Sequence, residues 1–535
     1  MVSRSWKTLL LWTASIVAAF VLATVLVVTV ADARSGSSAG GASEALPDVR
    51  PPPAQRTFRS EVIDGLLMTL RPLMKTEDLG TLLSNCLPNT LDTTVYYYSA
   101  NTTIQLDTFI ITGDINAMWL RDSTNQVLPY VPYGSEDEDL QRMLEGVIAR
   151  QARSVLIDSY ANAFNYNASG AGYQEDTRTP PMTPPVYEGK YEVDSLLAFL
   201  KLSYWHWRSS GDAALERFAS ADWISAVGRT LETLQVMQRD DGRSANPPYL
   251  FQCETNEALY TLGEQGRGPP SRPQGMTRSL FRPSDDAVTL PYNVPGNAMA
   301  CVELTHLQDL LDRLALLTGG GDSSQARLML QQAQEVAEGI CGALDKLMQQ
   351  QQQGGEASPL PFELDGFGAQ YYMDDANIPS LLSLPVLGYL SPNSAQYTAT
   401  RAFALSPANP YFYTGSEGRG VGGPHEGVNF TWPMAVIAQA MTSADDAEVA
   451  WCLQMLVRSS AGTGLMHESF DVDDVSNYTR DWFAWANGLL GELLLQLVLT
   501  KPHLVLLDSP EAVGAAQAVV RAPVSLMAQR EALVQ

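Results

Sequence analysis

The sequence predicts an all-α fold in which paired helices form a ring and one face of loops carries the functional site. Long segments with apolar residues at helical spacing recur along the chain, whereas the alternation typical of strands is sparse. The loops between these segments concentrate Trp, Asp, Arg, His and Glu instead of ordinary turn residues. Functional side chains are often carried by connecting loops, so we expect the site there.

The helical pattern covers most of the chain. Helices are expected at residues 58–73, 139–157, 193–208, 221–238, 297–317, 324–349, 432–442, 446–459 and 482–500. Two connections stand out. Residues 240–274 form a Pro- and Gly-rich excursion that either shapes a substrate cleft or is a plain insertion, and residues 349–358 are a glutamine-rich surface loop.

The N-terminus carries a targeting signal. Residues 9–30 are uncharged and follow Arg4 and Lys7, which predicts a membrane-spanning helix with its N-terminus in the cytosol. The alternative is a cleaved secretory signal, because residues 31–33 resemble a small-residue cleavage site. Both hypotheses place the bulk of the chain outside the cytosol.

The composition then divides the chain into four parts. Residues 1–33 are the cytosolic tip and membrane anchor, and residues 34–55 are a flexible stem rich in Gly, Ser and Pro. Residues 56–510 form one large domain that holds the candidate site. Residues 511–535 are a C-terminal tail with helical tendency and no assigned chemistry.

Charge and cysteine content exclude some partners. The chain has 59 acidic against 34 basic residues, and this excess would repel the phosphates of nucleic acids. A neutral sugar meets no such repulsion. The five cysteines form no CxxC pair and there are only five histidines, so no metal site is expected. Sequons at Asn101, Asn167, Asn429 and Asn477 are consistent with the secretory route.

Two adjacent acids, Asp285 and Asp286, follow a rigid Arg-Pro corner. Glycoside cleavage needs one carboxylic acid to protonate the departing oxygen and a second carboxylate to activate water or attack the sugar. Neighbouring carboxyls in different environments can acquire different pKa values, which would leave one of them protonated near neutrality. The alternative is an Asp pair that caps a helix or turn.

Glu468 is the candidate for the second carboxylate. It follows His467 and precedes a run with three aspartates, a polar turn suited to a general base. The run lacks the second histidine of the HExxH zinc motif, because position 471 is Asp. The alternatives are an acidic surface loop or a weak calcium site.

A third cluster places Trp119 beside Arg121 and Asp122. An aromatic face can pack on a sugar ring while charged groups bind its hydroxyls, so this composition is typical of a sugar subsite. A buried Arg-Asp pair near a core tryptophan would look the same. Asp375 and His425 lie in further polar runs that helix caps or core packing also explain.

Taken in order, these motifs resemble those of glycoside hydrolase family 125, the exo-α-1,6-mannosidases. The matching stretches span most of residues 58–500. They are TGDINAMWLRDSTNQVLPY (112–130), RMLEGVIARQARSVLIDSYANAFN (142–165), YEVDSL (191–196), FRPSDDA (281–287), ELDGFGAQYYMDDANIPSLLSLPVLGY (363–389), HESFDVDD (467–474) and TRDWFAWANGLLGEL (479–493).

The resemblance implies an (α/α)6 barrel that removes non-reducing terminal mannose with inversion, without a metal or other cofactor. It implies an aspartate as general acid, carried onto Asp285 or Asp286, and a glutamate as general base, carried onto Glu468. Asp285 is favoured because the wider (α/α)6 hydrolases place their acid at the first position of a similar Ser-x-Asp turn. The residues expected to hold the mannose are Trp119, Arg121, Asp122, Asp375 and His425.

The chain departs from the family pattern at two places. Residues 187–190 read Tyr-Glu-Gly-Lys where Trp-Glu-Arg-Lys is usual, and residues 291–297 differ from the usual Tyr-x-Ile-Pro-Ser-Asn ending. These changes concern the choice of substrate. The alternatives are a glucosidase or trehalase of (α/α)6 type, a metal-dependent mannosidase, and a non-catalytic lumenal glycan-binding protein. With its anchor, the enzyme is expected in the Golgi or another secretory-pathway membrane as a single-pass type II protein, or else to be secreted.

Overall fold

The computed structural model describes residues 45–99, 105–318, 321–352 and 355–533. The predicted membrane anchor at residues 9–30 lies outside these ranges. Among the helices of the described part, none combines the length and the apolar character that a membrane span requires.

Helices that are buried along most of their length contact one another and form the inner wall of a ring. They are α5 (Leu120–Val127), α7 (Val193–Ser210), α11 (Val294–Thr318), α14 (Pro433–Met441) and α16 (Ala484–Thr500). α5, α7 and α11 contact one another in succession, and α14 contacts α16, which returns to α5. Between α11 and α14, Ile378 and Val386 line a small internal cavity together with residues of α5, α7 and α16.

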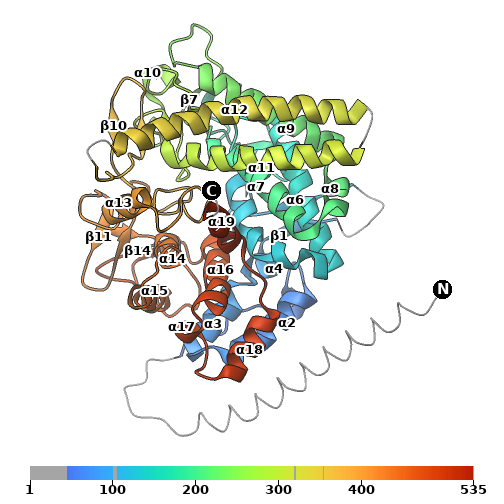
Figure 1. The fold of residues 1–535 in the computed structure, drawn as a ribbon, viewed down its shortest axis with the longest axis vertical. Helices are drawn as coiled ribbons and strands as arrows, with labels where there is room; N and C mark the ends of the chain where they lie inside the picture. The colour runs from blue at the N-terminus through green and yellow to red at the C-terminus, as the bar shows by residue number, and fades with distance from the viewer. Residues whose placement is uncertain (1–44, 100–104, 319–320, 353–354, 534–535) are drawn as a thin grey trace, which may run out of the picture.

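A second layer of amphipathic helices covers this wall. It consists of α3 (Glu77–Cys86), α6 (Glu138–Ile157), α9 (Ala221–Arg239), α12 (Gly321–Gln351), α13 (Ala395–Ala404) and α15 (Asp446–Ser459). α6, α9, α12 and α15 present apolar residues to the interior and polar residues outward, whereas α3 is buried along most of its length. α12 runs alongside α11 (Figure 1), and a disulfide between Cys301 and Cys341 joins the two helices.

All helices that the periodicity predicted are observed, with ends that differ by a few residues. The predicted segment 446–459 coincides with α15, whereas the segment 58–73 is divided into α2 (Glu61–Leu70) and a short 3-10 helix, η3 (Arg71–Leu73). The sequence did not indicate α5, because its residues are mostly polar although nearly all are buried. The other helices of the described part are η2 (Pro53–Gln55), α4 (Asn89–Thr93), η4 (Leu128–Glu136), α8 (Asp212–Phe218), α10 (Gly263–Gly266), α17 (Pro502–Val505), α18 (Pro510–Val519) and α19 (Val524–Ala532).

Both ends of the described chain pack on the ring. In the segment assigned to the stem, Arg50 forms ion pairs with Asp64 and Asp92, so residues 45–55 contact the folded part. In the segment assigned to the tail, the backbone N–H of Ser525 donates to the buried carboxylate of Glu492 on α16 at 2.8 Å. The ordered body therefore extends beyond residues 56–510 on both sides.

Short strands occur in the loops, where the sequence indicated almost none. Two three-stranded sheets are important for the site: β3 (Met118–Trp119) with β4 (Ala163–Phe164) and β6 (Val186–Glu188), and β13 (Phe430–Thr431) with β14 (Ser469–Asp471) and β15 (Tyr478–Thr479). Strands of two or three residues are too short for an alternating pattern to be recognised. The other strands are β1 (Val95–Tyr98), β2 (Thr108–Ile110), β5 (Thr177–Thr179), β7 (Leu250–Gln252), β8 (Tyr292–Asn293), β9 (Glu363–Leu364), β10 (Gln370–Tyr371), β11 (Phe412–Thr414) and β12 (Arg419–Val421).

Candidate active site

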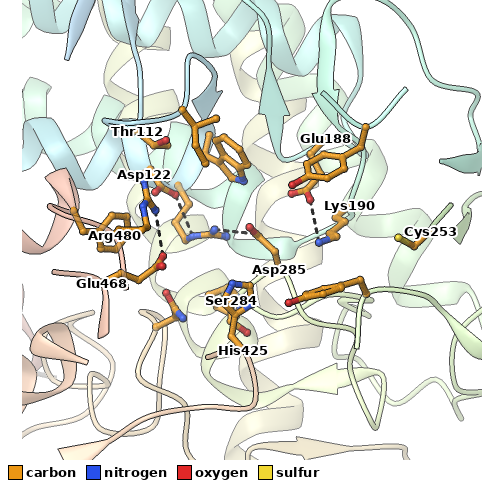
Figure 2. A pocket seen from close by; sticks show the side chains of 18 of the residues that line it. Thr112, Asp122, Glu188, Lys190, Cys253, Ser284, Asp285, His425, Glu468 and Arg480 are labelled. Atoms are coloured by element: carbon orange, nitrogen blue, oxygen red, sulfur yellow. Dashed lines mark hydrogen bonds and ion pairs between the residues drawn. The ribbon is translucent and has the colours of Figure 1, made fainter. Parts of the chain in front are cut away.

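A cavity of about 450 Å³ lies at the N-terminal ends of the inner helices (Figure 2). Its walls come from the loops that precede α5, α7, α11, α14 and α16, together with the first residues of α5 and α16. The excursion at residues 240–274 adds Cys253, Glu254, Glu257 and Tyr260 to one wall, so it helps to shape the cleft. Side chains distant in the sequence therefore meet in one site.

The two three-stranded sheets hold opposite parts of this cavity. On one part, β3 and β6 carry Trp119 and Glu188. On the other, Glu468 directly precedes β14 and Arg480 directly follows β15, and these strands pair so that the two residues lie at the same end of the sheet. Figure 2 shows Glu468 with Arg480 on one side, Glu188 on the other, and Asp285 between them.

Only one acid of the adjacent pair reaches the cavity. Asp285 occupies a tight turn with a left-handed φ of 65°, and its side chain is 22% exposed. Asp286 is fully buried: its Oδ1 lies 2.9 Å from Nδ1 of His425, and it accepts a hydrogen bond from Ser284. The structure therefore distinguishes the two, with Asp285 facing the cavity and Asp286 supporting His425.

Glu468 faces the same cavity from the second sheet. Its Oε1 accepts a hydrogen bond from Nη1 of Arg480 at 3.2 Å, and Arg480 also pairs with Asp114. Burial raises the pKa of Glu468 to about 7; Arg480 opposes this shift and the neighbouring Glu426 adds to it. A carboxyl group with this pKa can exchange a proton with water near neutrality.

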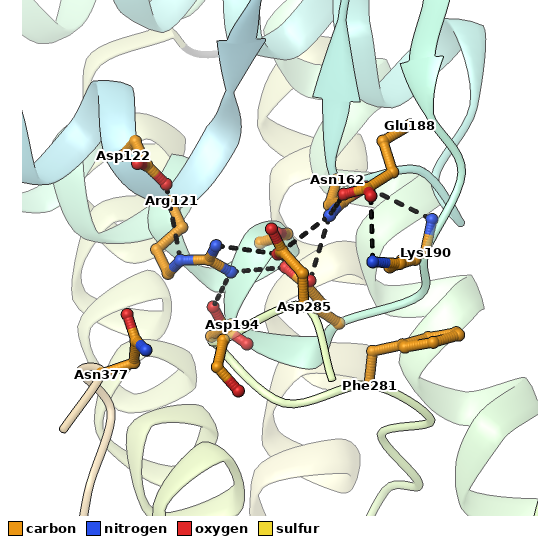
Figure 3. Close-up of polar contacts among 12 residues, drawn as sticks. Arg121, Asp122, Asn162, Glu188, Lys190, Asp194, Phe281, Asp285 and Asn377 are labelled. Atoms are coloured by element: carbon orange, nitrogen blue, oxygen red, sulfur yellow. Dashed lines mark hydrogen bonds and ion pairs between the residues drawn. The ribbon is translucent and has the colours of Figure 1, made fainter. Parts of the chain in front are cut away.

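On the opposite side of the cavity, Arg121 binds several carboxyl groups at once. Its guanidinium donates to Glu192 at 2.5 Å, to Asp194 at 3.3 Å and to Asp285 at 3.1 Å (Figure 3). Asn162 donates a further hydrogen bond to Glu192 at 3.0 Å and lies 3.3 Å from Asp285. These bonds fix the orientation of the Asp285 carboxyl.

The departure from the family pattern at residues 187–190 lies in this wall. Lys190 pairs with Glu188 at 3.0 Å, and both side chains line the cavity. A Cβ atom at Gly189 would lie 2.6 Å from the side chain of Arg178, which is buried against Asp158. Position 189 therefore has no room for the arginine of the family pattern, because the buried side chain of Arg178 already occupies that space.

The predicted sugar-binding residues divide into two groups. The residues that line the cavity are Trp119, Arg121, Asp122 and His425. Asp375 does not line it: this carboxylate is 2% exposed and accepts hydrogen bonds from the backbone of Asn377 at 3.0 Å and from Ser284 at 3.4 Å. Asp375 therefore lies next to the cavity, where it holds the lining residues Ser284 and Asn377, and its direct contact with a sugar stays a prediction.

Two indole donors in the cavity wall lack a partner. Nε1 of Trp119 and Nε1 of Trp432 are buried, and neither has a hydrogen-bond acceptor among the described residues. A buried donor without a partner costs about 1–3 kcal/mol. A ligand hydroxyl that came within reach of either nitrogen would supply the missing acceptor.

Several residues of the site were missed by the sequence analysis. Asn162, Glu188, Lys190 and Arg480 carry polar contacts, and Trp432 carries an unpartnered donor. Asn162 lies inside one of the matched stretches, and Glu188 and Lys190 lie in the run noted for its departure from the family. Their charges gave no signal by themselves, since isolated polar residues near helix ends are common.

Comparison with known proteins agrees with a sugar-cleaving site. The family model described as metal-independent alpha-mannosidase matches residues 76–495. The meiotically up-regulated gene 157 protein of Schizosaccharomyces pombe is 40% identical over 478 residues, which cover 86% of this chain and 90% of that protein. A solved Streptococcus pneumoniae metal-independent α-mannosidase, in a non-productive complex with α-1,6-mannobiose, is 35% identical with a TM-score of 0.73, covering 82% of this chain and 98% of its own. The chain therefore belongs to glycoside hydrolase family 125, the metal-independent α-mannosidases.

Proposed function

We propose that this protein is an inverting exo-α-1,6-mannosidase in which Asp285 is the general acid and Glu468 the general base. The observation that carries the proposal is the cavity itself: it brings these two carboxyls, from separate loops, into one pocket with unpartnered indole donors. Inverting glycosidases need this arrangement of two acids on opposite faces of the sugar.

The chemistry follows from the two positions. Asp285 would donate its proton to the glycosidic oxygen as the bond to the anomeric carbon breaks and the electron pair leaves with that oxygen. Glu468 would take a proton from a water molecule whose oxygen attacks the anomeric carbon from the other face. The product is mannose of inverted configuration, together with a glycan that is one residue shorter.

The size of the site supports exo action. A cavity of about 450 Å³ lies in the range of small-ligand pockets and suits the end of a glycan, not a long stretch of one. The bound disaccharide in the pneumococcal relative is α-1,6-mannobiose, which supports the linkage.

A panel of linkage-defined mannobioses followed by NMR tests this function. We expect release of mannose from the α-1,6 linkage in preference to α-1,2 and α-1,3, with β-mannose as the first anomer and no loss of rate in the presence of a chelator. No release from any α-mannoside would reject the function. First appearance of α-mannose would reject inversion alone.

We also infer that the ring is the (α/α)6 barrel expected of the family. Five inner positions correspond to α5, α7, α11, α14 and α16 of the described chain. The segment around Ile378 and Val386 corresponds to the sixth, since it meets three of these helices at the internal cavity.

The proposed location is the lumenal side of a Golgi or other secretory-pathway membrane. The uncharged run at residues 9–30 supports an anchor, and the Cys301–Cys341 disulfide suits an oxidising compartment. The sequon asparagines Asn167, Asn429 and Asn477 are exposed. Protease protection in intact microsomes, with and without detergent, tests this: digestion without detergent would contradict a lumenal domain.

A further inference from the structure

The general acid interacts with a second, hidden carboxyl group. The side chains of Asp285 and Glu192 share two hydrogen-bond donors, and each of them shifts the pKa of the other. Arg121 donates to both, and Asn162, which donates to Glu192, lies 3.3 Å from Asp285. The side chain of Glu192 has no exposed surface, whereas that of Asp285 is 22% exposed to the cavity.

Two carboxylates do not stay close together when both are ionised. Like charges at this separation repel strongly where water is excluded, so such a pair holds one proton between its members. The surrounding charges agree with this. Among the described residues, the four carboxyls of Glu188, Glu192, Asp194 and Asp285 form ion pairs with Arg121 and Lys190. His425, whose pKa is raised to about 9, adds a third positive charge near Asp285, so one negative charge of the four stays unbalanced.

We propose that Glu192 stores the proton that Asp285 delivers to the glycosidic oxygen. This inference rests on the proposed function, since it needs Asp285 as the acid. Glu192 is a positioning residue: it cannot reach the substrate, and it acts through Asp285. In the resting enzyme the shared proton resides on Glu192; when substrate fills the cavity, the proton moves to Asp285 and from there to the departing oxygen.

The proton balance closes over one turnover. The Glu192 O–H bond breaks as the Asp285 O–H bond forms, and the latter breaks as the leaving oxygen becomes a hydroxyl. Glu192 is then a carboxylate held by Arg121 at 2.5 Å and by Ser195 Oγ at 3.0 Å. Water supplies the hydroxyl at the anomeric carbon and passes its other proton through Glu468 to solvent, and the Glu192–Asp285 pair takes one proton back.

The electrostatics of the unliganded site support this order. Burial raises the pKa of Glu192 well above its usual range, and the charge of Asp285 raises it further. Burial alone would raise the pKa of Asp285, but Arg121 and the interaction with Glu192 together lower it. Asp285 alone would therefore be a carboxylate at neutrality and a poor acid, and a neighbouring proton store removes that difficulty.

The decisive variant is Glu192→Gln, compared with wild type on α-1,6-mannobiose and on an aryl α-mannoside with an activated leaving group. Glutamine keeps the size but cannot pass on a proton, and its amide would stabilise ionised Asp285. We expect turnover of mannobiose to fall on the order of 10²-fold, and turnover of the aryl mannoside, which needs no acid, to change by less than about fivefold. The alkaline limb of the pH profile should also move to lower pH.

Two further variants separate this role from simple support of the structure. Asp194→Asn removes another carboxylate on Arg121, at 3.3 Å, and should affect both substrates equally. Ser195→Ala removes a donor to the Glu192 carboxylate at 3.0 Å, so Glu192 should hold its proton more tightly and the alkaline limb should move to higher pH. Ser195→Ala is a small substitution, so it remains informative if the Glu192→Gln protein does not fold.

The outcomes are distinct. Equal losses on both substrates in Glu192→Gln, or an unchanged alkaline limb in Ser195→Ala, would overturn the proton store while leaving the proposed function intact. A wild-type enzyme that releases mannose from neither substrate would overturn the function, and this inference with it. Loss confined to mannobiose, with opposite shifts of the alkaline limb in the two variants, would support the inference.

Discussion

The two carboxyls that face the cavity are held by different kinds of structure. Asp285 lies in a strained turn, surrounded by Arg121, Asn162 and a second carboxyl. Glu468 lies at the end of a three-stranded sheet and has one ion-pair partner, Arg480. The several polar neighbours of Asp285 lower its pKa. On the sparse side of the cavity, where Glu468 has few polar neighbours, burial raises the pKa of Glu468 to about 7.

This difference teaches that pKa direction alone does not assign the roles. In the unliganded protein, the shifts by themselves would name Glu468 the acid and Asp285 the base. The roles proposed here follow when Asp285 is treated as half of a pair that holds one proton. The predictions below test each side of the cavity, beginning with the largest effect.

The first prediction separates the roles directly. Glu468→Gln should lower turnover of both mannobiose and an activated aryl mannoside, each by on the order of 10² to 10⁴-fold, because water must be deprotonated with either substrate. Asp285→Asn, the matched control from the other side, should lose the mannobiose activity by a similar factor and keep most of the aryl activity. Steady-state kinetics measure both. The opposite pattern would exchange acid and base.

The second prediction tests the indole donors, one on each side. Trp119→Phe and Trp432→Phe each remove an unpartnered N–H from the cavity wall. Loss of the hydrogen bond between this N–H and a sugar hydroxyl should weaken binding by about 1–2 kcal/mol, which lowers kcat/KM about tenfold. Trp451→Phe, on the outer helix α15, is the control and should leave kinetics unchanged. Unchanged kinetics in both cavity variants would show that these indoles do not bind the substrate.

The third prediction concerns pH on the sparse side. Because the pKa of Glu468 is about 7, the base is protonated below that pH, and kcat/KM should rise as pH increases through 7. Arg480 lowers the pKa of Glu468, so Arg480→Gln should move this acidic limb to higher pH. Asp114→Asn keeps the Arg480 charge and is the control. A limb that stays in place in Arg480→Gln would show that another group titrates there.

The sequence was most informative about the fold where the helices are long. The outer helices α6, α9, α12 and α15 are of this kind, and the periodicity predicted all of them. It did not predict α5, whose buried polar side chains serve the site and the core. The short outer helices α3 and α13 were missed as well, whereas the buried inner helices α7 and α16 were predicted because they are long and rich in apolar residues.

The site was predicted where its residues share a motif. Trp119, Arg121 and Asp122 come from one run at the start of α5, and all line the cavity. Trp432 was missed because it stands beside no charged residue. For Asp375 the sequence did not show that its carboxylate bonds to the neighbouring Asn377 and to Ser284, because a sequence does not reveal which side of a turn a carboxylate faces.

The last and smallest effect tests whether Asp375 contacts the substrate or supports its neighbours. Asp375→Asn keeps the size of this buried side chain and weakens its hydrogen bonds to Asn377 and Ser284. We expect a loss of about 1 kcal/mol in unfolding free energy and less than about threefold change in KM. Asp122→Asn, in the cavity wall, should instead raise KM by about tenfold, since charge-assisted bonds to hydroxyls are the stronger ones. Thermal unfolding and KM measured on the same preparations separate the two. A KM effect in Asp375→Asn equal to that in Asp122→Asn would mean that Asp375 contacts the substrate.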